Sequence, residues 1–215
     1  STDLVDNGEL RTGPADFGDC PSTLPEYVDR STPSAGLAAG CNVLIGQTGS
    51  EIEQGLEAAR RAIEGNADFL RNSARLVVVF FADEDDCTAM LELDRSNPDN
   101  CLWQTEHLVS VDDFARYFSV SAHSLAGNPL SVFAIVGPPD DRDFDPGEAP
   151  VASCQGGAAA LAGERYVRIT EADRVDRHSL FENICASSYV PAMDRLMEHS
   201  ILVADDALCM SLPMG

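Results

Sequence analysis

The sequence predicts an α/β fold with three layers, in which a mainly parallel, doubly wound sheet carries helices on both faces. Residues 76–82 are a continuous apolar segment, and residues 129–137 are mostly apolar; both have the length and the β-branched and aromatic content of strands buried on both faces. Segments with helical periodicity alternate with these strands, as expected of a parallel sheet. We expect residues 76–82 to form the central strand.

The remaining elements are expected in the following order along the chain. Residues 5–40 are rich in Gly, Pro, Asp, Ser and Thr and predict a long surface loop, followed by a short strand or turn at 43–45. A helix is predicted from the N-cap Ser50 to Gly65. The later segments are predicted to be a helix at 111–126, a short helix at 156–163, a strand at 166–169 and a helix at 179–200 that Pro191 kinks. Residues 1–203 are assigned to one domain and residues 204–215 to a tail.

The net charge and the hydropathy pattern argue against nucleic-acid binding and against a membrane-spanning helix. The 215-residue chain has a formal net charge of −22, and its 14 basic residues are all arginine. A chain this acidic repels phosphate, which argues against nucleic-acid binding and favours cations or basic protein surfaces. No apolar segment reaches the roughly 18 residues that a membrane-spanning helix requires.

The cysteines predict disulfide-tied loops and an oxidising compartment. The seven cysteines are spread along the chain, and none belongs to a CxxC motif or to a zinc-type cluster with histidine. Pairing of neighbours predicts the bonds Cys20–Cys41, Cys87–Cys101 and Cys154–Cys185. Cys209 is then left for a partner outside the chain or as a free thiol. The expected location is outside the cell, at the cell surface or in the periplasm.

The motifs of common enzymes are absent from the sequence. There is no GxSxG nucleophile elbow, and the turn at 46–51 lacks the P-loop pattern and its lysine. The four histidines are scattered and are expected on helix surfaces or in loops. We therefore expect no catalysis, with a hydrolase or phosphatase that uses Asp83 or Asp85 as the weakest alternative.

Four consecutive acids, Asp83 to Asp86, follow the predicted strand 76–82 directly. Ligands of α/β sheets gather at the carboxyl ends of the strands, and crowded carboxylates are commonly relieved by a divalent cation. Thr48, in a loop before a helix, is placed to reach the same edge. We expect Asp83 to be held firmly by the strand, and the later acids to lie on a turn where they reach water. The competing interpretation is a solvated acidic turn.

The order of these segments resembles the von Willebrand factor A domain, in a secreted bacterial form. The likeness covers most of residues 1–200 and is carried by residues 1–4, 46–48 with 53–58, 69–87, 132–137, 165–166 and 184–185. The resemblance implies a metal-ion-dependent adhesion site made of a DxSxS loop, a threonine and an aspartate. Thr48 and Asp83 match the last two, and the DxSxS loop is not found. We therefore expect the chain to begin downstream of that loop.

The resemblance implies an extracellular protein-binding or adhesion module. The candidate ligands for Mg²⁺ or Ca²⁺ are Thr48, Asp83 and Asp85, and a carboxylate of a partner protein is expected to complete the coordination. Loss of the first strand and helix is expected to require an upstream segment, a second chain or self-association to cover the sheet. The alternative is a structural building block of an extracellular assembly with a vestigial metal site.

Overall fold

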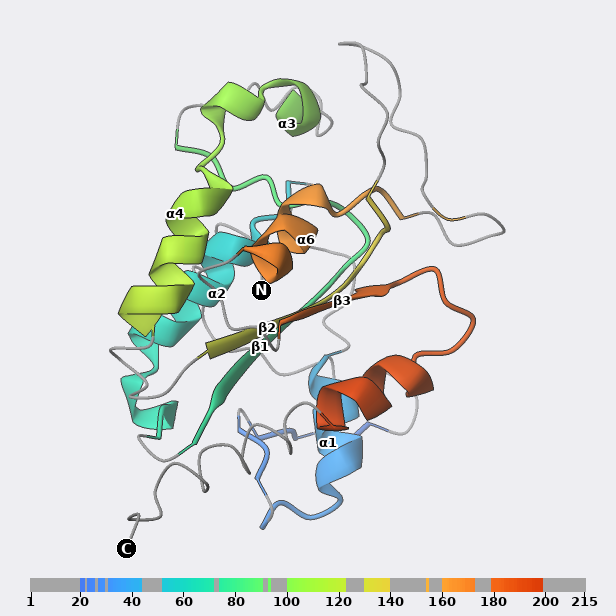
Figure 1. The fold of residues 1–215 in the computed structure, drawn as a ribbon. Coiled ribbons are helices and arrows are strands. Elements are labelled where there is room, and N and C mark those ends of the chain that lie inside the picture. Colours follow the sequence, from blue (N-terminus) through green and yellow to red (C-terminus); the bar gives the residue numbers. More distant parts are fainter. Residues whose placement is uncertain are drawn as a thin grey trace, which may run out of the picture.

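The computed structural model describes residues 20–21, 23–25, 27–29, 31–43, 52–71, 74–90, 93, 100–122, 130–139, 154, 160–172 and 179–198 (Figure 1). Their centre is a sheet of three parallel strands in the order β1-β2-β3. The strands are β1 (Leu76–Ala82), β2 (Leu130–Val136) and β3 (Leu180–Asn183). Helices alternate with the strands along the chain. The mixed α/β fold and the parallel sheet predicted from the sequence are therefore confirmed.

Side chains alternate between the two faces of the sheet, as the pleat requires. In β1 and β2, Phe80 and Ala134 are paired and belong to one hydrophobic cluster, whereas Phe133 and Ile135 belong to another. Every residue of β2 is buried. The central strand among the three is thus β2 and not β1, which corrects the prediction for residues 76–82.

Three helices cover the first face of the sheet: α2 (Gly55–Gly65), α4 (Val111–Arg116) and α6 (Glu164–Glu171) (Figure 1). Helix α4 begins at the N-cap Ser110, whose hydroxyl accepts a hydrogen bond from the Asp112 N–H, and continues into a π-helical turn, η3 (Tyr117–Ser121). The helices bury their apolar stripes against the strands, which is the main source of stability for amphipathic helices of this length. The fully buried members of this core include Leu56, Phe118, Val132, Ala134 and Ile169.

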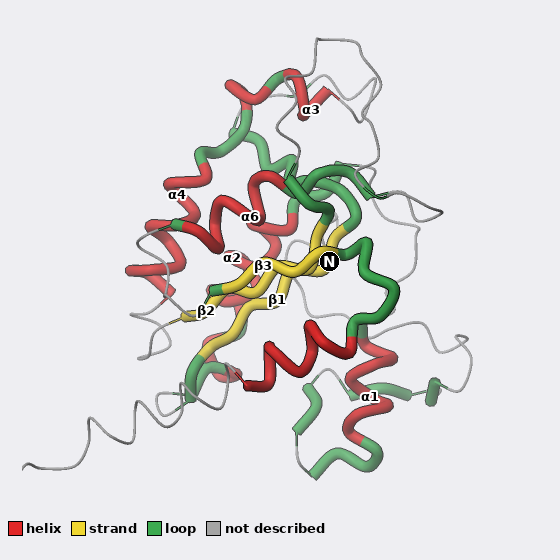
Figure 2. Tube along the Cα trace, turned by 45° about the vertical axis from the view of Figure 1, so that its right-hand side comes forward, coloured by secondary structure: helices red, strands yellow, loops and turns green. Residues whose placement is uncertain are grey.

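A different set of helices lies on the second face. The helix at residues 190–198 places Ala192 and Leu196 against Phe133 and Ile135 of β2. Helix α1 (Ala35–Asn42) lies on the same side of the sheet (Figure 2). This face is covered less completely than the first, because Val79 and Phe81 of β1 remain exposed.

Short helical turns connect the larger elements. They are η1 (Ala67–Phe69), α3 (Asn100–Trp103) and η2 (Thr105–His107), and His107 lies in the last of them. A small apolar cluster forms around the Cys87–Cys101 pair with Ile52, Leu93 and Leu108. In the part of the chain that the structure describes, no helix has the length and apolarity required to cross a bilayer.

All three predicted disulfides are formed. The Cα atoms of Cys20–Cys41, Cys87–Cys101 and Cys154–Cys185 are 5.7, 5.6 and 5.3 Å apart, within the usual range for a disulfide. The paired cysteines are 21, 14 and 31 residues apart in the sequence. The prediction of disulfide-tied loops is confirmed, whereas Cys209 lies outside the described residues.

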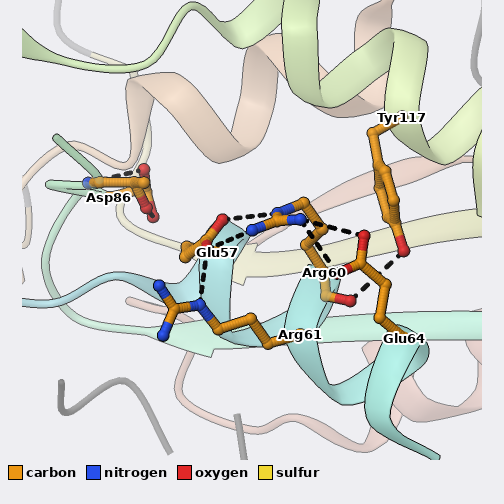
Figure 3. Close-up of polar contacts among 7 residues, drawn as sticks. Glu57, Arg60, Arg61, Glu64, Asp86 and Tyr117 are labelled. Carbon is orange, nitrogen blue, oxygen red and sulfur yellow. Dashed lines mark hydrogen bonds and ion pairs between the residues drawn. The ribbon is translucent and has the colours of Figure 1, made fainter. Parts of the chain in front are cut away.

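Helix α2 carries an ionic cluster on its outer surface (Figure 3). Glu57 accepts hydrogen bonds from Arg60 Nε at 2.7 Å and from Arg61 Nε at 2.6 Å, and Arg60 also pairs with Glu64 at 3.0 Å. The Tyr117 hydroxyl donates to the carbonyl oxygen of Arg60, whose guanidinium lies 6.0 Å from the Tyr117 ring centroid. These contacts attach α2 to the turn that follows α4.

Several predicted elements differ from the structure. Residues 166–169 belong to helix α6 and not to a strand, and the predicted helix at 179–200 begins with β3 and becomes helical only at 190. The loop predicted at 5–40 contains most of helix α1, and α2 begins at Gly55, after the predicted start. Ala160 to Gly163 are not helical. Residues 1–19, 44–51 and 199–215 are not described, so the predictions there, including Ser50, the short strand and the tail, are untested.

Candidate functional site

The four acids that follow β1 divide into an outer and an inner pair. Asp83 is exposed and Glu84 is half-buried, whereas Asp85 and Asp86 are 8% and 1% exposed. From the sequence we expected β1 to hold Asp83 firmly and the later acids to reach water. The backbone of Asp83 is held by β1, but the expectation is wrong for Asp85 and Asp86. These two acids are buried because the chain turns inward after Ala82 and inserts their carboxylates between α2 and α6.

Asp86 is the centre of a buried hydrogen-bond network. Its Oδ1 accepts from the Leu56 N–H at 2.9 Å and from the Thr88 hydroxyl at 2.8 Å, and its Oδ2 accepts from the Thr88 N–H at 3.1 Å. Arg165 Nε completes the set at 3.2 Å from Oδ2. Burial raises the pKa of Asp86, and the Arg165 guanidinium and the donors from Leu56 and Thr88 oppose that rise. The carboxylate is therefore fully used in holding together α2, α6 and the segment after β1 (its position beside α2 is visible in Figure 3).

Arg165 connects the inner acids to two other elements. Its backbone N–H, in the first turn of α6, donates to Asp85 Oδ1 at 2.9 Å. Its Nη2 donates to the carbonyl oxygen of Val109, just before α4, at 2.6 Å. The side chain is largely buried, so these contacts are shielded from solvent. One arginine thus binds the inner pair of acids and the start of α4 together.

Two carboxyl groups of this region have a strongly perturbed pKa. Burial raises the pKa of Asp85 to about 7, despite the hydrogen bond from the Arg165 N–H. Burial also raises the pKa of Glu53 to about 7, and the nearby carboxylates of Glu84, Asp83 and Asp86 add to the rise. Asp83 and Glu84 therefore produce a negative potential at the carboxyl end of β1 that favours the protonated form of Glu53.

The backbone at this end of the sheet is also tied together. The Cys87 N–H donates to the carbonyl oxygen of Glu53 at 2.7 Å, and the Leu161 N–H donates to the carbonyl oxygen of Asp83 at 2.7 Å. The disulfide from Cys87 to Cys101 adds a covalent link. The acidic edge, which we define as Glu53 with Asp83 to Asp86, is thus a fixed junction of three chain segments.

Close packing fills the space behind the acidic edge. The Tyr166 ring is completely buried and lies 4.9 Å from the Phe80 ring, centroid to centroid. A Cβ atom at Gly55 would clash with the Tyr166 hydroxyl, and one at Gly163 would lie 2.6 Å from Val136 Cγ2. Glycine is therefore required at both positions for α2 and α6 to approach the sheet.

The structure separates the predicted site residues. Asp83 and Asp85 both lie at the acidic edge, but Asp83 faces solvent and Asp85 is buried against Arg165. Thr48 lies outside the described residues. Across the ranges that the structure describes, no three Asp, Glu, His or Cys side chains are grouped as metal ligands. The predicted binding of Mg²⁺ or Ca²⁺ by Thr48, Asp83 and Asp85 remains a prediction.

Glu53 and Arg165 were not predicted as members of the site. In the sequence, Glu53 lies in the first turn of the helix predicted from Ser50, and Arg165 precedes a segment predicted to be a strand. Arg165 directly follows Gly163-Glu164. An acid after a glycine is typical of a helix start, so this pattern could have placed Arg165 in the first turn of a helix. No comparable signal identified Glu53.

Comparison with known proteins found no relative of this chain. No protein-family model, curated protein or solved structure matches the chain.

Proposed function

We propose that this protein is an extracellular module that binds a protein partner at the acidic edge of its sheet, and that it acts by binding and not by catalysis. The observation that carries this proposal is Asp83, an exposed carboxylate on a backbone that is held by β1 on one side and by the Leu161 N–H on the other. Its neighbour Glu84 adds negative charge, which contributes to the raised pKa of Glu53. A preorganised carboxylate of this kind suits a lysine or arginine of a partner.

Two features of the whole chain support this assignment. Three disulfides are typical of proteins in oxidising compartments, which supports an extracellular location. A net charge of −22 favours association with basic proteins and accelerates it by long-range attraction. The buried network around Asp86 supplies the rigid support that a binding site on a loop requires.

The resemblance to von Willebrand factor A domains implies a divalent cation, and the described donor set does not fit one. Asp85 already accepts the Arg165 N–H and has a pKa that burial raises, and Asp86 is surrounded by four donors. Among the four acids that follow β1, Asp83 is the one whose side chain is exposed to solvent. The proposed binding therefore uses basic side chains of the partner and needs no metal.

A matched pair of variants tests the proposal. Hexa-arginine peptide is the probe, and its dissociation constant is measured by fluorescence anisotropy in the presence of EDTA and then of Mg²⁺ or Ca²⁺. Asp83→Asn is expected to weaken binding about fivefold to tenfold, because a charge-assisted hydrogen bond is lost. Asp112→Asn removes the same charge from the exposed start of α4 and is expected to change binding by less than about twofold.

A second candidate function is a structural building block, which the rigid Asp86 network and the disulfides favour. In that case the two variants would bind the peptide equally, because only the net charge would matter. Binding that appears only with Mg²⁺ or Ca²⁺ and is abolished by Asp83→Asn would instead support the metal-dependent adhesion site.

A further inference from the structure

Within the described residues, strand β1 is paired along one edge only, and we call its other edge the open edge. It pairs with β2 along its whole length, from Leu76↔Leu130 to Ala82↔Val136, and the other edge carries no strand among the residues that the structure describes. Strand β2, by contrast, pairs with a strand on each side. An unpaired edge exposes backbone N–H and C=O groups that can accept a further strand.

The face of β1 beside this edge is apolar and exposed. Val79 and Phe81 are 42% and 56% exposed, although they lie in a parallel sheet, where both faces are normally covered. The Tyr189 ring meets the Phe81 ring edge-on, with centroids 5.2 Å apart, and connects this face to the helix at 190–198. That helix adds the exposed side chains Val190, Met193 and Met197, which recur at helical spacing.

Exposed large apolar side chains on neighbouring elements mark an interaction surface. We define the β1 surface as Val79, Phe81, Tyr189, Val190, Met193 and Met197. The acidic edge begins where β1 ends, so the strand direction leads from the apolar side chains to Asp83 and Glu84. A partner that binds here must therefore offer apolar side chains to the β1 surface and positive charge to Asp83 and Glu84.

The net charge of the chain indicates which kind of partner can bind the β1 surface. A second copy would bring another net charge of −22 to the same surface and would be repelled. A segment with apolar residues at alternate positions and basic residues at one end matches both parts of the surface. Strand addition uses the backbone for affinity and alternate side chains for specificity, which this combination of open edge and exposed face provides.

We propose that an extended segment of a partner protein, apolar at alternate positions and basic at one end, adds to the open edge of β1 as a strand and covers Val79 and Phe81. This inference rests on the proposed protein-binding function and identifies the form of the partner. The seven residues of β1 extend about 23 Å, so a partner segment of about seven residues matches the strand.

The probe is a capped peptide of alternating valine and threonine with two arginines, made in two versions that carry the arginines at the N-terminal or the C-terminal end. The dissociation constant is measured by fluorescence anisotropy, and hydrogen exchange of the β1 amides is followed with and without peptide. One version is expected to bind and to slow exchange in β1. Methylation of the alternate backbone nitrogens that face β1 in that version is expected to weaken binding by about tenfold or more, since the hydrogen bonds that these N–H groups donate are lost.

Two protein variants locate the contact. Phe81→Ser removes an exposed ring from the β1 surface, and Phe69→Ser is the matched control, because Phe69 is 53% exposed and also contacts one aromatic ring, that of Tyr27. Phe81→Ser is expected to weaken peptide binding about tenfold, and Phe69→Ser by less than about twofold.

The outcomes separate the two proposals. Hexa-arginine binding that depends on Asp83, together with no effect of N-methylation or of Phe81→Ser on the valine peptide, would overturn strand addition and leave the acidic edge intact. Peptide binding that depends on Phe81 but not on Asp83 would support strand addition and contradict the role of the edge. Sedimentation that shows a dimer abolished by Phe81→Ser would assign the surface to a second copy and overturn the inference.

Discussion

Strands β1 and β2 have the same length and similar composition, and they lie side by side in register, yet their surroundings differ. All seven residues of β2 are buried, whereas the first three residues of β1 are half-buried and its last four alternate between exposed side chains, such as Phe81, and buried ones, such as Phe80. Phe81 and Ile135 are direct neighbours across the strand pair, and only Ile135 is covered. A continuous apolar segment therefore indicates a strand but does not decide whether the strand is central or at an edge.

The same contrast is repeated in the acidic segment that follows β1. Asp86 is buried in a network of four donors, and Asp83, three residues earlier, is exposed. Four similar side chains in sequence thus divide into structural and surface groups. Burial, and not residue type, is expected to decide what each one contributes to stability.

The largest effect is expected from the inner acid. Asp86→Ala leaves the Arg165 guanidinium and the donors of Leu56 and Thr88 without their acceptor, so we expect the free energy of unfolding to fall by about 3–5 kcal/mol. Asp83→Ala is expected to change it by less than about 0.5 kcal/mol. Urea unfolding of both variants under non-reducing conditions measures the difference. If Asp86→Ala does not fold, Asp86→Asn, which keeps one acceptor oxygen, should fold with an intermediate loss.

A smaller effect is expected from the paired strand residues. Ile135→Ala opens a cavity in the covered part of the second face and is expected to cost about 3 kcal/mol. Phe81→Ala removes a larger side chain but is expected to cost only about 1 kcal/mol, because its ring is mostly exposed already. Equal losses in thermal or urea unfolding would show that the face of β1 is covered in solution.

Glu53 is expected to make stability depend on pH. Its pKa is raised to about 7 in the folded protein, so the folded state binds the proton more tightly than the unfolded state, and stability falls as pH rises from about 4.5 to about 7. Glu53→Gln removes this loss. We expect the variant to be more stable than the natural protein by about 1–2 kcal/mol at pH 8, after allowance for solvent screening, and to show little difference at pH 4.

The control for the Glu53 prediction is Glu106→Gln, which alters an exposed glutamate in η2. Unfolding free energies are measured at several pH values from 4 to 8. A difference between Glu53→Gln and the natural protein that stays constant across this range would contradict the raised pKa of Glu53.

The smallest effect is expected on the outer surface of α2. Glu64→Gln breaks the exposed pair with Arg60 and is expected to cost less than about 0.5 kcal/mol, and the loss should vanish at high salt. Thermal unfolding in low and high sodium chloride measures this. A loss as large as that of Asp86→Ala would show that the ionic cluster of α2, and not the buried network, holds α2 in place.

The sequence by itself determined the local features that depend on nearest neighbours. The strands at 76–82 and 130–136 followed from their β-branched and aromatic content, and the end of α2 at Gly65 followed from Gly65-Asn66, where the Asn66 side chain donates to the carbonyl oxygen of Ala62. The cysteine pairing also emerged from sequence order, because neighbouring cysteines in loops have the shortest segments to close.

The tertiary structure alone decided the features that depend on partners distant in the chain. Residues 166–169 have strand-like composition but form part of α6, because a helix buries Tyr166, Val167 and Ile169 together against the sheet. Residues 180–183 form β3 because β2 offers them a second edge to pair with. Asp86 became buried because Leu56, 30 residues before it, and Arg165, 79 residues after it, supply the hydrogen bonds that offset its desolvation, and no local pattern encodes contacts at such separations.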